Sequence, residues 1–172
     1  YAVSARGGLF ISTNGGTSWT LAPGCDLLPS GTRMASVCID HTNDSIIYLG
    51  GGDHNYYSTG SGIWKSTNAG NTFTQTTLTG KIVCEMVMDP TNNQVIVAAT
   101  NTGIYKTTNA GSTWTLKSTA HTFDDLKQKT PTSRTLYAAT TDSAFFRSTD
   151  FGETWTEITN GIVLPAGVTT GG

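Results

Sequence analysis

The segment Ser66-Thr-Asn-Ala-Gly-Asn-Thr-Phe73 decides the fold, because closely similar octapeptides recur along the chain. The other copies are Ser12-Thr-Asn-Gly-Gly-Thr-Ser-Trp19, Thr107-Thr-Asn-Ala-Gly-Ser-Thr-Trp114 and Ser148-Thr-Asp-Phe-Gly-Glu-Thr-Trp155. Each copy follows a short apolar or aromatic stretch and precedes a short polar, threonine-containing one. Each is therefore predicted to form the turn of a β-hairpin, and the repetition indicates an all-β protein.

Three positions of the octapeptide have residue types that suit a tight turn. The Asn or Asp at the third position is expected to accept hydrogen bonds from backbone N–H groups two residues further on. The glycine at the fifth position allows a positive φ, and the final aromatic side chain is expected to pack back over its hairpin. A Trp at that final position also needs a partner for its indole N–H. The predicted structural turn residues are Ser12, Asn14, Gly16, Trp19, Ser66, Asn68, Gly70, Phe73, Thr107, Asn109, Gly111, Trp114, Ser148, Asp150, Gly152 and Trp155.

Neither a metal site nor a cofactor is expected. Asp150 is the one charged residue among the four equivalent third positions, and a single carboxylate is too little charge to hold calcium. The three cysteines lack the spacing of a zinc site. Two interpretations of them stay open: Cys38 and Cys84 are small apolar strand residues, or Cys25 and Cys38 form a disulfide.

The octapeptide resembles the Asp-box, also called the bacterial neuraminidase repeat, whose pattern is Ser-x-Asp-x-Gly-x-Thr-Trp. Three copies here have Asn in place of Asp, and one has Phe in place of Trp. The repeats are similar to those of xyloglucanase-type glycoside hydrolases, sortilin-type receptors and secreted bacterial propeller proteins, and the similarity extends along the whole chain. This resemblance implies a β-propeller, in which each repeat is one four-stranded antiparallel blade.

On that architecture the chain is a single propeller array over residues 1–172. Complete blades are expected at residues 32–79, 81–118 and 121–159, and about one further blade is split between residues 1–21 and 161–172. The array is expected to be part of a larger propeller, and the alternative is a closed four-bladed ring. The sequence begins without an initiator Met or a leader, which fits an excised product.

The spacing of the turns predicts where a ligand would bind. The octapeptides begin 54, 41 and 41 residues apart, and the extra residues of the first interval fall in two segments, 21–32 and 50–61. In a propeller both segments emerge on the face opposite the octapeptide turns, and long loops on a rigid scaffold often carry binding residues. The candidate ligand-binding residues are Asp53, His54, Asn55, Tyr56 and Tyr57 in the second segment and Asp26 in the first.

Aromatic rings beside hydrogen-bonding groups suit a carbohydrate or protein ligand. The alternative is that Tyr56 or Tyr57 only packs on a neighbouring blade. With a net charge of -2 and 13% charged residues, the chain lacks the basic field that nucleic acid requires. Its apolar runs fall far short of the roughly 20 residues that span a membrane, so membrane insertion is not expected.

The resemblance implies two possible enzymatic activities. A sialidase needs three clustered arginines, and the four in this chain are dispersed. A glycoside hydrolase needs two opposed carboxylates, for which the candidates are Asp26, Asp53, Asp124, Asp125 and Asp142. None of them has a recognisable catalytic context. We therefore predict a non-catalytic, secreted or cell-surface binding or scaffold module, which further blades of a larger chain or an oligomeric partner would complete. The alternative is a fragment of a propeller glycoside hydrolase acting on polysaccharide.

Overall fold

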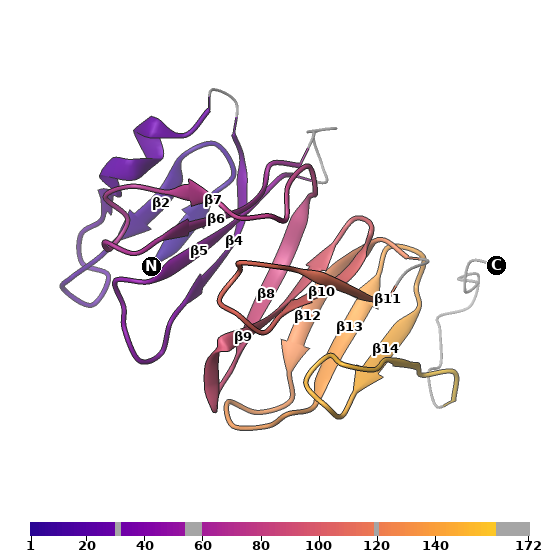
Figure 1. Cartoon of the computed structure of the whole chain (residues 1–172). Coiled ribbons are helices and arrows are strands. Elements are labelled where there is room, and N and C mark those ends of the chain that lie inside the picture. Colours follow the sequence, from indigo (N-terminus) through magenta and orange to yellow (C-terminus); the bar gives the residue numbers. More distant parts are fainter. Residues whose placement is uncertain (30–31, 54–59, 119–120, 161–172) are drawn as a thin grey trace.

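A computed structural model describes residues 1–29, 32–53, 60–118 and 121–160, and its small antiparallel sheets follow one another along the chain (Figure 1). Sheet I contains β1 (Ala2–Ser4), β2 (Gly8–Ile11) and β3 (Thr20–Leu21). Sheet II contains β4 (Met34–Ile39), β5 (Ile47–Gly51), β6 (Gly62–Ser66) and β7 (Thr74–Gln75). Sheet III contains β8 (Val83–Asp89), β9 (Asn92–Thr100), β10 (Gly103–Thr107) and β11 (Thr115–Ser118). Sheet IV contains β12 (Phe123–Gln128), β13 (Leu136–Thr140), β14 (Phe145–Ser148) and β15 (Thr156–Glu157).

Strands within each sheet lie in chain order, so every neighbouring pair is an antiparallel hairpin. This arrangement confirms the predicted all-β fold of four-stranded propeller blades. Sheet I has three described strands, and the fourth was expected within residues 161–172, which lie outside the described residues. The sequence did not predict the 3-10 helix η1 (Pro23–Leu27), which fills part of the longer first connection.

The octapeptides form the turns between the last two strands of each sheet. We call them turn 1 (Ser12–Trp19), turn 2 (Ser66–Phe73), turn 3 (Thr107–Trp114) and turn 4 (Ser148–Trp155). In turn 2 the Ser66 hydroxyl donates to Asn68 Oδ1 at 2.9 Å and accepts the Gly70 N–H at 2.9 Å. Asn68 Oδ1 also accepts the N–H of Thr72 at 2.9 Å. The same three bonds recur in turns 1, 3 and 4 at 2.7–3.0 Å.

This geometry corrects the bond that the sequence predicted. The third-position side chain accepts an N–H group four residues further on, not two. The N–H two residues beyond the third position donates instead to the hydroxyl at the first position, as Gly70 N donates to Ser66 Oγ at 2.9 Å. The hydroxyl at the first position therefore accepts the nearer backbone N–H group. The Asn or Asp side chain accepts the more distant one.

Two consecutive residues of each turn have positive φ. The fifth-position glycines have φ between 78° and 88°, and the residue before each is also left-handed, including Ala69 at 56° and Phe151 at 56°. At the last position, Trp19 Nε1 donates to Gly16 O at 3.1 Å. The buried indole N–H groups of Trp114 and Trp155 lack the partner that was expected, within the part of the chain that the structure describes.

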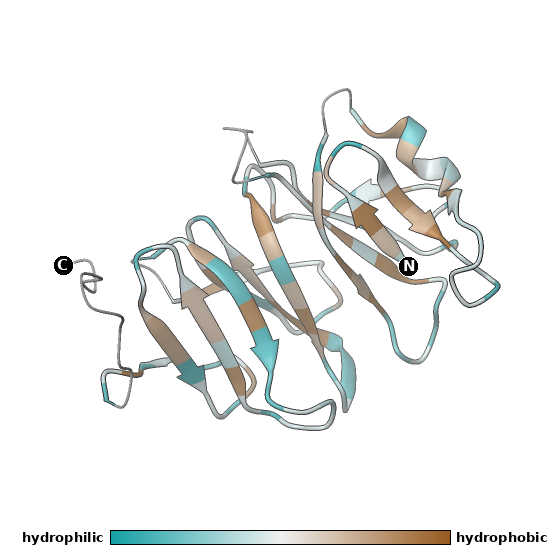
Figure 2. Cartoon of the chain, turned by 180° about the vertical axis from the view of Figure 1, so that it is seen from behind, coloured by the Kyte–Doolittle hydropathy of each residue, from teal (hydrophilic) through white to brown (hydrophobic). Residues whose placement is uncertain are grey.

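Apolar clusters lie between successive sheets. Hydrophobic colour runs along the strands, and the turns and loops at both ends are mostly polar (Figure 2). Leu9 of sheet I packs with Ile47 and Leu49 of sheet II. Ile63 packs with Met86 and Ile96 of sheet III, and Ile104 packs with Phe123 and Phe146 of sheet IV. Face-to-face packing of adjacent sheets is the arrangement that buries both faces of a propeller blade.

The described sheets form an open arc. Strands β1, β4, β8 and β12 are neighbours in that order, whereas sheets I and IV lie at opposite ends of the molecule (Figure 1). The closed four-bladed ring would instead bring sheet IV against sheet I. In the described residues no helix is long and apolar enough to cross a membrane.

Loops on the two ends of the sheets are joined by different hydrogen bonds. At one end turns 2 and 4 are tied to the loop between the first and second strands, as Ala69 N donates to Ser45 O at 2.9 Å and Phe151 N to Arg134 O at 3.0 Å. At the other end the remaining loops are tied together, as Gly52 N donates to Arg33 O at 2.8 Å and Thr141 N to Thr122 O at 3.1 Å. We call this second end the loop face.

Candidate functional site

Three equivalent β-bulges open onto the loop face. In sheets II, III and IV the register between the first two strands shifts close to the start of the first strand. The residues left unpaired by these shifts are Ala35, Cys84 and Asp124. A bulge redirects the side chain of its extra residue. Because β4, β8 and β12 are neighbours, the three redirected residues meet in one place.

The bulge residues line a cavity of about 320 Å³, which we call the bulge cavity. Its other lining residues are Ala5, Met34, Gly52 and Asp53. Four sheets thus contribute to one hollow at the inner end of the loop face. Its size and its mixture of apolar walls with a few polar groups are typical of small ligand sites.

Asp53 is the described member of the predicted Asp53–Tyr57 group, and it lines the bulge cavity. Its carboxylate lies 3.6 Å from Arg33 Nη1, and the two side chains are 11% and 22% exposed. Arg33 precedes β4 and Asp53 follows β5, so the ion pair fixes the base of the longer loop. A mostly buried, paired carboxylate can contribute charge to the cavity without being a free base.

Asp124 is an exposed carboxylate that lines the same cavity. Burial, followed by the negative charges of Asp124 and Glu85, raises the pKa of the Cys84 thiol to about 12. Cys84 is therefore protonated at neutral pH, and a thiol is a poor nucleophile compared with a thiolate. The cavity offers carboxylate charge and a neutral thiol.

Of the other predicted ligand residues, the structure describes Asp26, which does not line this cavity. His54, Asn55, Tyr56 and Tyr57 lie outside the described residues. Asp26 lies on η1 and lines a different cavity of about 460 Å³ with Arg6 and Leu28. Since η1 also bonds to turn 2 through Gly24 N and Gly70 O at 2.8 Å, this segment spans the edge of the molecule rather than the loop face alone.

A histidine and a carboxylate pair at the loop face of sheet IV. His121 Nδ1 lies 2.9 Å from Asp142 Oδ2, and the imidazole packs 5.1 Å from the Phe146 ring. Hydrogen bonds from Thr140 and then His121 lower the pKa of Asp142. The pair joins the loop before β12 to the loop after β13, and these are the loops that the Thr141–Thr122 backbone bond also joins.

The cysteines are all free thiols, so the Cys25–Cys38 disulfide is not formed. Cys38 is buried in β4, which agrees with its interpretation as a small apolar strand residue. Among the residues that the structure describes, no three His, Cys, Asp or Glu side chains gather as metal ligands would.

Sequence reasoning missed the bulges. Their residue types differ in size and charge, so no pattern marks them along the chain. The one available signal was their equivalent position in the repeat, close to the start of each first strand.

Comparison with protein families gives a decisive match. The profile of Sortilin-Vps10, described as "Sortilin, neurotensin receptor 3", matches residues 61–164, which is more than half of the chain. The chain belongs to the Sortilin-Vps10 family. This match covers the end of sheet II and all described strands of sheets III and IV, including three of the four turns of this sortilin-type chain. A comparison with curated proteins gives no match.

Solved structures share the fold of this sortilin-type chain. An ancestral GH74 enzyme superposes with a TM-score of 0.71 at 20% identity, over 94% of this chain and 24% of the enzyme. The GH74 enzyme of Niastella koreensis superposes with a TM-score of 0.69 at 26% identity, over 91% of this chain and 26% of that enzyme. YCF48 bound to D1 peptide superposes with a TM-score of 0.53 at 12% identity, over 76% of this chain and 42% of the YCF48 chain. The chain thus spans about a quarter of the length of the GH74 enzymes that it matches.

Proposed function

We propose that this chain is a non-catalytic binding section of a sortilin-type propeller, and that its bulge cavity holds a basic group of a polypeptide ligand. The observation that carries the proposal is the convergence of three equivalent bulges on one cavity with Asp53 at its rim. A repeated distortion that converges on one hollow is typical of a built recognition site, since bulges commonly lie next to functional sites.

The charge of the cavity favours a cation. Asp53 and Asp124 both bring a carboxylate to the cavity, and Arg33 lies beside Asp53. Two carboxylates on one cavity suit a lysine or arginine side chain or an amino terminus, because a charge-assisted hydrogen bond to a carboxylate is stronger than a neutral one. Apolar contact with Met34 would accommodate the methylene groups of such a side chain.

Relatives support a polypeptide ligand. The family description names a receptor, which also supports action at the cell surface or in the secretory space. YCF48, whose fold is similar, is bound to a peptide. The octapeptide turns support a place among Asp-box propellers, in which further blades of the same protein would extend the arc.

A peptide array on the immobilised chain tests the proposal. We expect peptides with a lysine or arginine to bind more tightly than the same peptides with glutamate, and added NaCl to weaken the binding. Asp124→Asn is expected to weaken binding about tenfold, the loss of one charge-assisted bond. The matched control is Asp44→Asn, which removes an exposed carboxylate at the opposite end of the sheets. Equal effects of the two variants would contradict the proposal.

A glycoside hydrolase is the second candidate. It is favoured by the similarity to the GH74 enzymes and by the two carboxylates on one cavity. Such an enzyme needs one carboxyl group as acid and another as base or nucleophile. Release of reducing ends from polysaccharide by the chain, lost in Asp124→Asn and kept in Asp44→Asn, would establish it and exclude a purely binding role.

A further inference from the structure

Two neighbouring joints between sheets share one construction. Lys65 is the residue before turn 2 and Lys106 is the residue before turn 3, and each donates to the turn of the following sheet. At the joint between sheets III and IV, Lys106 Nζ donates to the carboxylate of Glu153 in turn 4 at 3.1 Å. Lys117 of β11 pairs with the other oxygen of this carboxylate. Glu153 is thus an acidic side chain held by two ammonium groups of the preceding sheet.

The joint between sheets II and III has the first lysine and lacks the carboxylate. Ser112 of turn 3 takes the place of Glu153 in turn 4, the sixth position of the octapeptide. Thr76 takes the place of Lys117, three residues after the end of its turn. Among the residues that the structure describes, no carboxylate lies within ion-pair distance of Lys65. An ammonium group without a counter-ion therefore stands where its counterpart has one.

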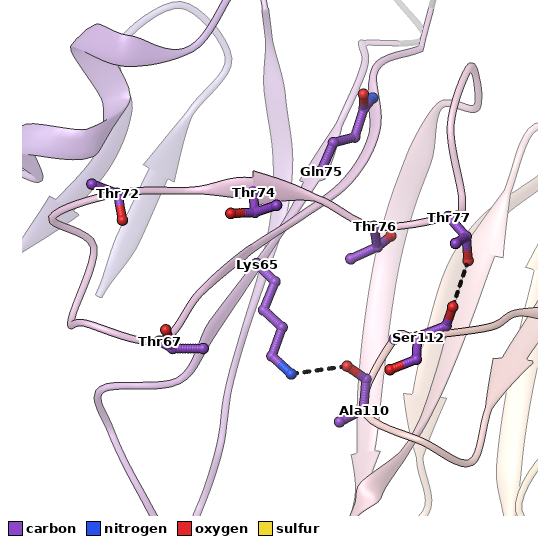
Figure 3. A pocket seen from close by; sticks show the side chains of 10 residues that line it. Lys65, Thr67, Thr72, Thr74, Gln75, Thr76, Thr77, Ala110 and Ser112 are labelled. Carbon is purple, nitrogen blue, oxygen red and sulfur yellow. Dashed lines mark hydrogen bonds between the residues drawn. The ribbon is translucent and has the colours of Figure 1, made fainter.

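A hollow of about 270 Å³, which we call the joint hollow, lies at this position. It is lined by Lys65, by Thr67, Thr72 and residues 74–77, and by residues 110–112 of turn 3. In Figure 3 the Lys65 side chain extends from its strand towards Ala110 and Ser112. The volume suits one side chain of a ligand, since pockets for whole small molecules start at about 300 Å³. Both walls belong to sheets inside the described arc, so further blades at either end would not fill the hollow.

The joint hollow offers hydrogen-bond donors to an anion. The Lys65 ammonium group has three N–H donors, and the Ala110 carbonyl oxygen accepts one of them at 3.0 Å. The hydroxyls of Thr67, Thr74 and Ser112 have no hydrogen-bond partner among the described residues. Burial lowers the pKa of Lys65, as it does for an ammonium group that has lost part of its water. A bound carboxylate would compensate for this loss.

We propose that the joint hollow binds a glutamate or aspartate side chain of a polypeptide partner. The partner's carboxylate accepts from Lys65 Nζ, as Glu153 accepts from Lys106, and from the Ser112 hydroxyl. The partner is a polypeptide because a glutamate side chain occupies the corresponding place between sheets III and IV. The joint hollow shares no lining residue with the bulge cavity, so this site for an acidic group is separate from the proposed site for a basic one.

An NMR titration of the ¹⁵N-labelled chain with acetyl-tetraglutamate amide tests the proposal. We expect the backbone amide signals of residues 74–77 and 110–112 to shift, with a dissociation constant on the order of 1 mM. Acetyl-tetraglutamine amide has the same backbone without the charges. It should bind at least about tenfold more weakly, because a hydrogen bond to a charged group is stronger than one to a neutral group.

Two variants remove the site in opposite ways. Lys65→Met keeps most of the aliphatic chain and deletes the charge. Ser112→Glu supplies a carboxylate from turn 3 itself, at the position of Glu153. Each should raise the dissociation constant of the acidic peptide at least about tenfold. Because Ser112→Glu retains Lys65 and its bond to Ala110, it tests the site independently of any effect of Lys65→Met on folding.

Matched controls make the same changes elsewhere. Lys129→Met deletes an exposed lysine between β12 and β13, and Thr17→Glu adds a carboxylate at the sixth position of turn 1. Both should bind the acidic peptide like the wild type, and thermal unfolding verifies that each variant folds. Asp124→Asn, in the bulge cavity, should also bind it like the wild type. The outcome is therefore independent of the proposed binding function.

Three results would overturn the proposal. The first is that these amide signals stay unshifted up to about 10 mM acidic peptide, or that the glutamine peptide shifts them equally. The second is that Ser112→Glu and its control Thr17→Glu bind the acidic peptide alike. The third uses polygalacturonate, which has the same carboxylate on a carbohydrate. Binding of this polymer in place of the acidic peptide would overturn the assignment to a polypeptide partner.

Discussion

Lys65 Nζ lies 5.2 Å from the centre of the Tyr48 ring, and both side chains end on the carbonyl oxygen of Ala110 in the next sheet. One backbone carbonyl thus receives two donors from a neighbouring blade. Tyr48 is buried by this contact, and burial raises the pKa of its phenol. The joint between sheets II and III therefore depends on named polar side chains as well as on apolar packing.

Tyr48→Phe tests that joint. Removing the hydroxyl deletes one hydrogen bond to Ala110 O, and we expect the free energy of unfolding to fall by about 1 kcal/mol. Tyr137→Phe is the matched control, since Tyr137 has the same strand position on the exposed face of sheet IV. In dilute solution it should change stability by less than about 0.5 kcal/mol. Urea unfolding measures both, and equal losses would show that the Ala110 contact does not stabilise the joint.

Asp150→Asn tests the charged turn. Burial would raise the pKa of Asp150, but hydrogen bonds from Thr154, Ser148 and the Glu153 N–H outweigh it and lower the pKa to about 2, from 3.8. Because the folded pKa is lowered, the carboxylate stabilises the fold fully above 3.8, and this contribution is lost as pH falls towards about 2. We expect the variant to fold, since Asn109 makes the equivalent bonds in turn 3.

At pH 7 the Asp150→Asn variant should be about 1 kcal/mol less stable than the wild type, because a hydrogen bond to a charged group is stronger than one to a neutral amide. The difference should shrink to zero between about pH 4 and pH 2. Thermal unfolding across this range provides the measurement. A difference that is constant with pH would mean that the carboxylate charge does not contribute.

Glu153→Gln tests the link between sheets III and IV. Lys106, 7% exposed, donates to Glu153 at 3.1 Å, and Lys117 pairs with the same carboxylate. Hydrogen bonds from Lys117 and then Lys106 lower the pKa of Glu153. We expect the free energy of unfolding to fall by about 1 kcal/mol at pH 7. The loss is small because the Glu153 side chain is 50% exposed and water screens its charge. Glu157→Gln, an exposed change on β15, should have no measurable effect, and equal losses would argue against the link.

A double-mutant cycle of Arg33→Met and Asp53→Asn tests the base of the longer loop. The pair is mostly buried, so we expect a coupling energy of about 1 kcal/mol in urea unfolding. The exposed pair of Lys127 and Asp125, 3.2 Å apart, is the control and should couple by less than about 0.5 kcal/mol. If Arg33 and Asp53 behave independently, their ion pair does not fix the loop.

The octapeptide turns were the part of the fold most accessible from sequence. Their hydrogen bonds join residues at most four positions apart, so the residue types that make them lie together in the printed chain. Even there the donor to Asn68 was misassigned, because the sequence does not show which of two nearby acceptors takes a given N–H. The helix η1 was missed, since a short helical turn leaves no periodic pattern.

Sequence alone determined the strand and turn units and their antiparallel order, because these depend on local hydrogen bonding and on alternation along single strands. Tertiary structure decided that Ala35, Cys84 and Asp124 share one cavity, and that Tyr48 is buried while Tyr137 is not. The physical reason is that a bulge depends on the pairing of two strands, and burial depends on which sheet lies alongside. Residues of identical type at equivalent positions therefore differ in environment according to the presence of a neighbouring turn.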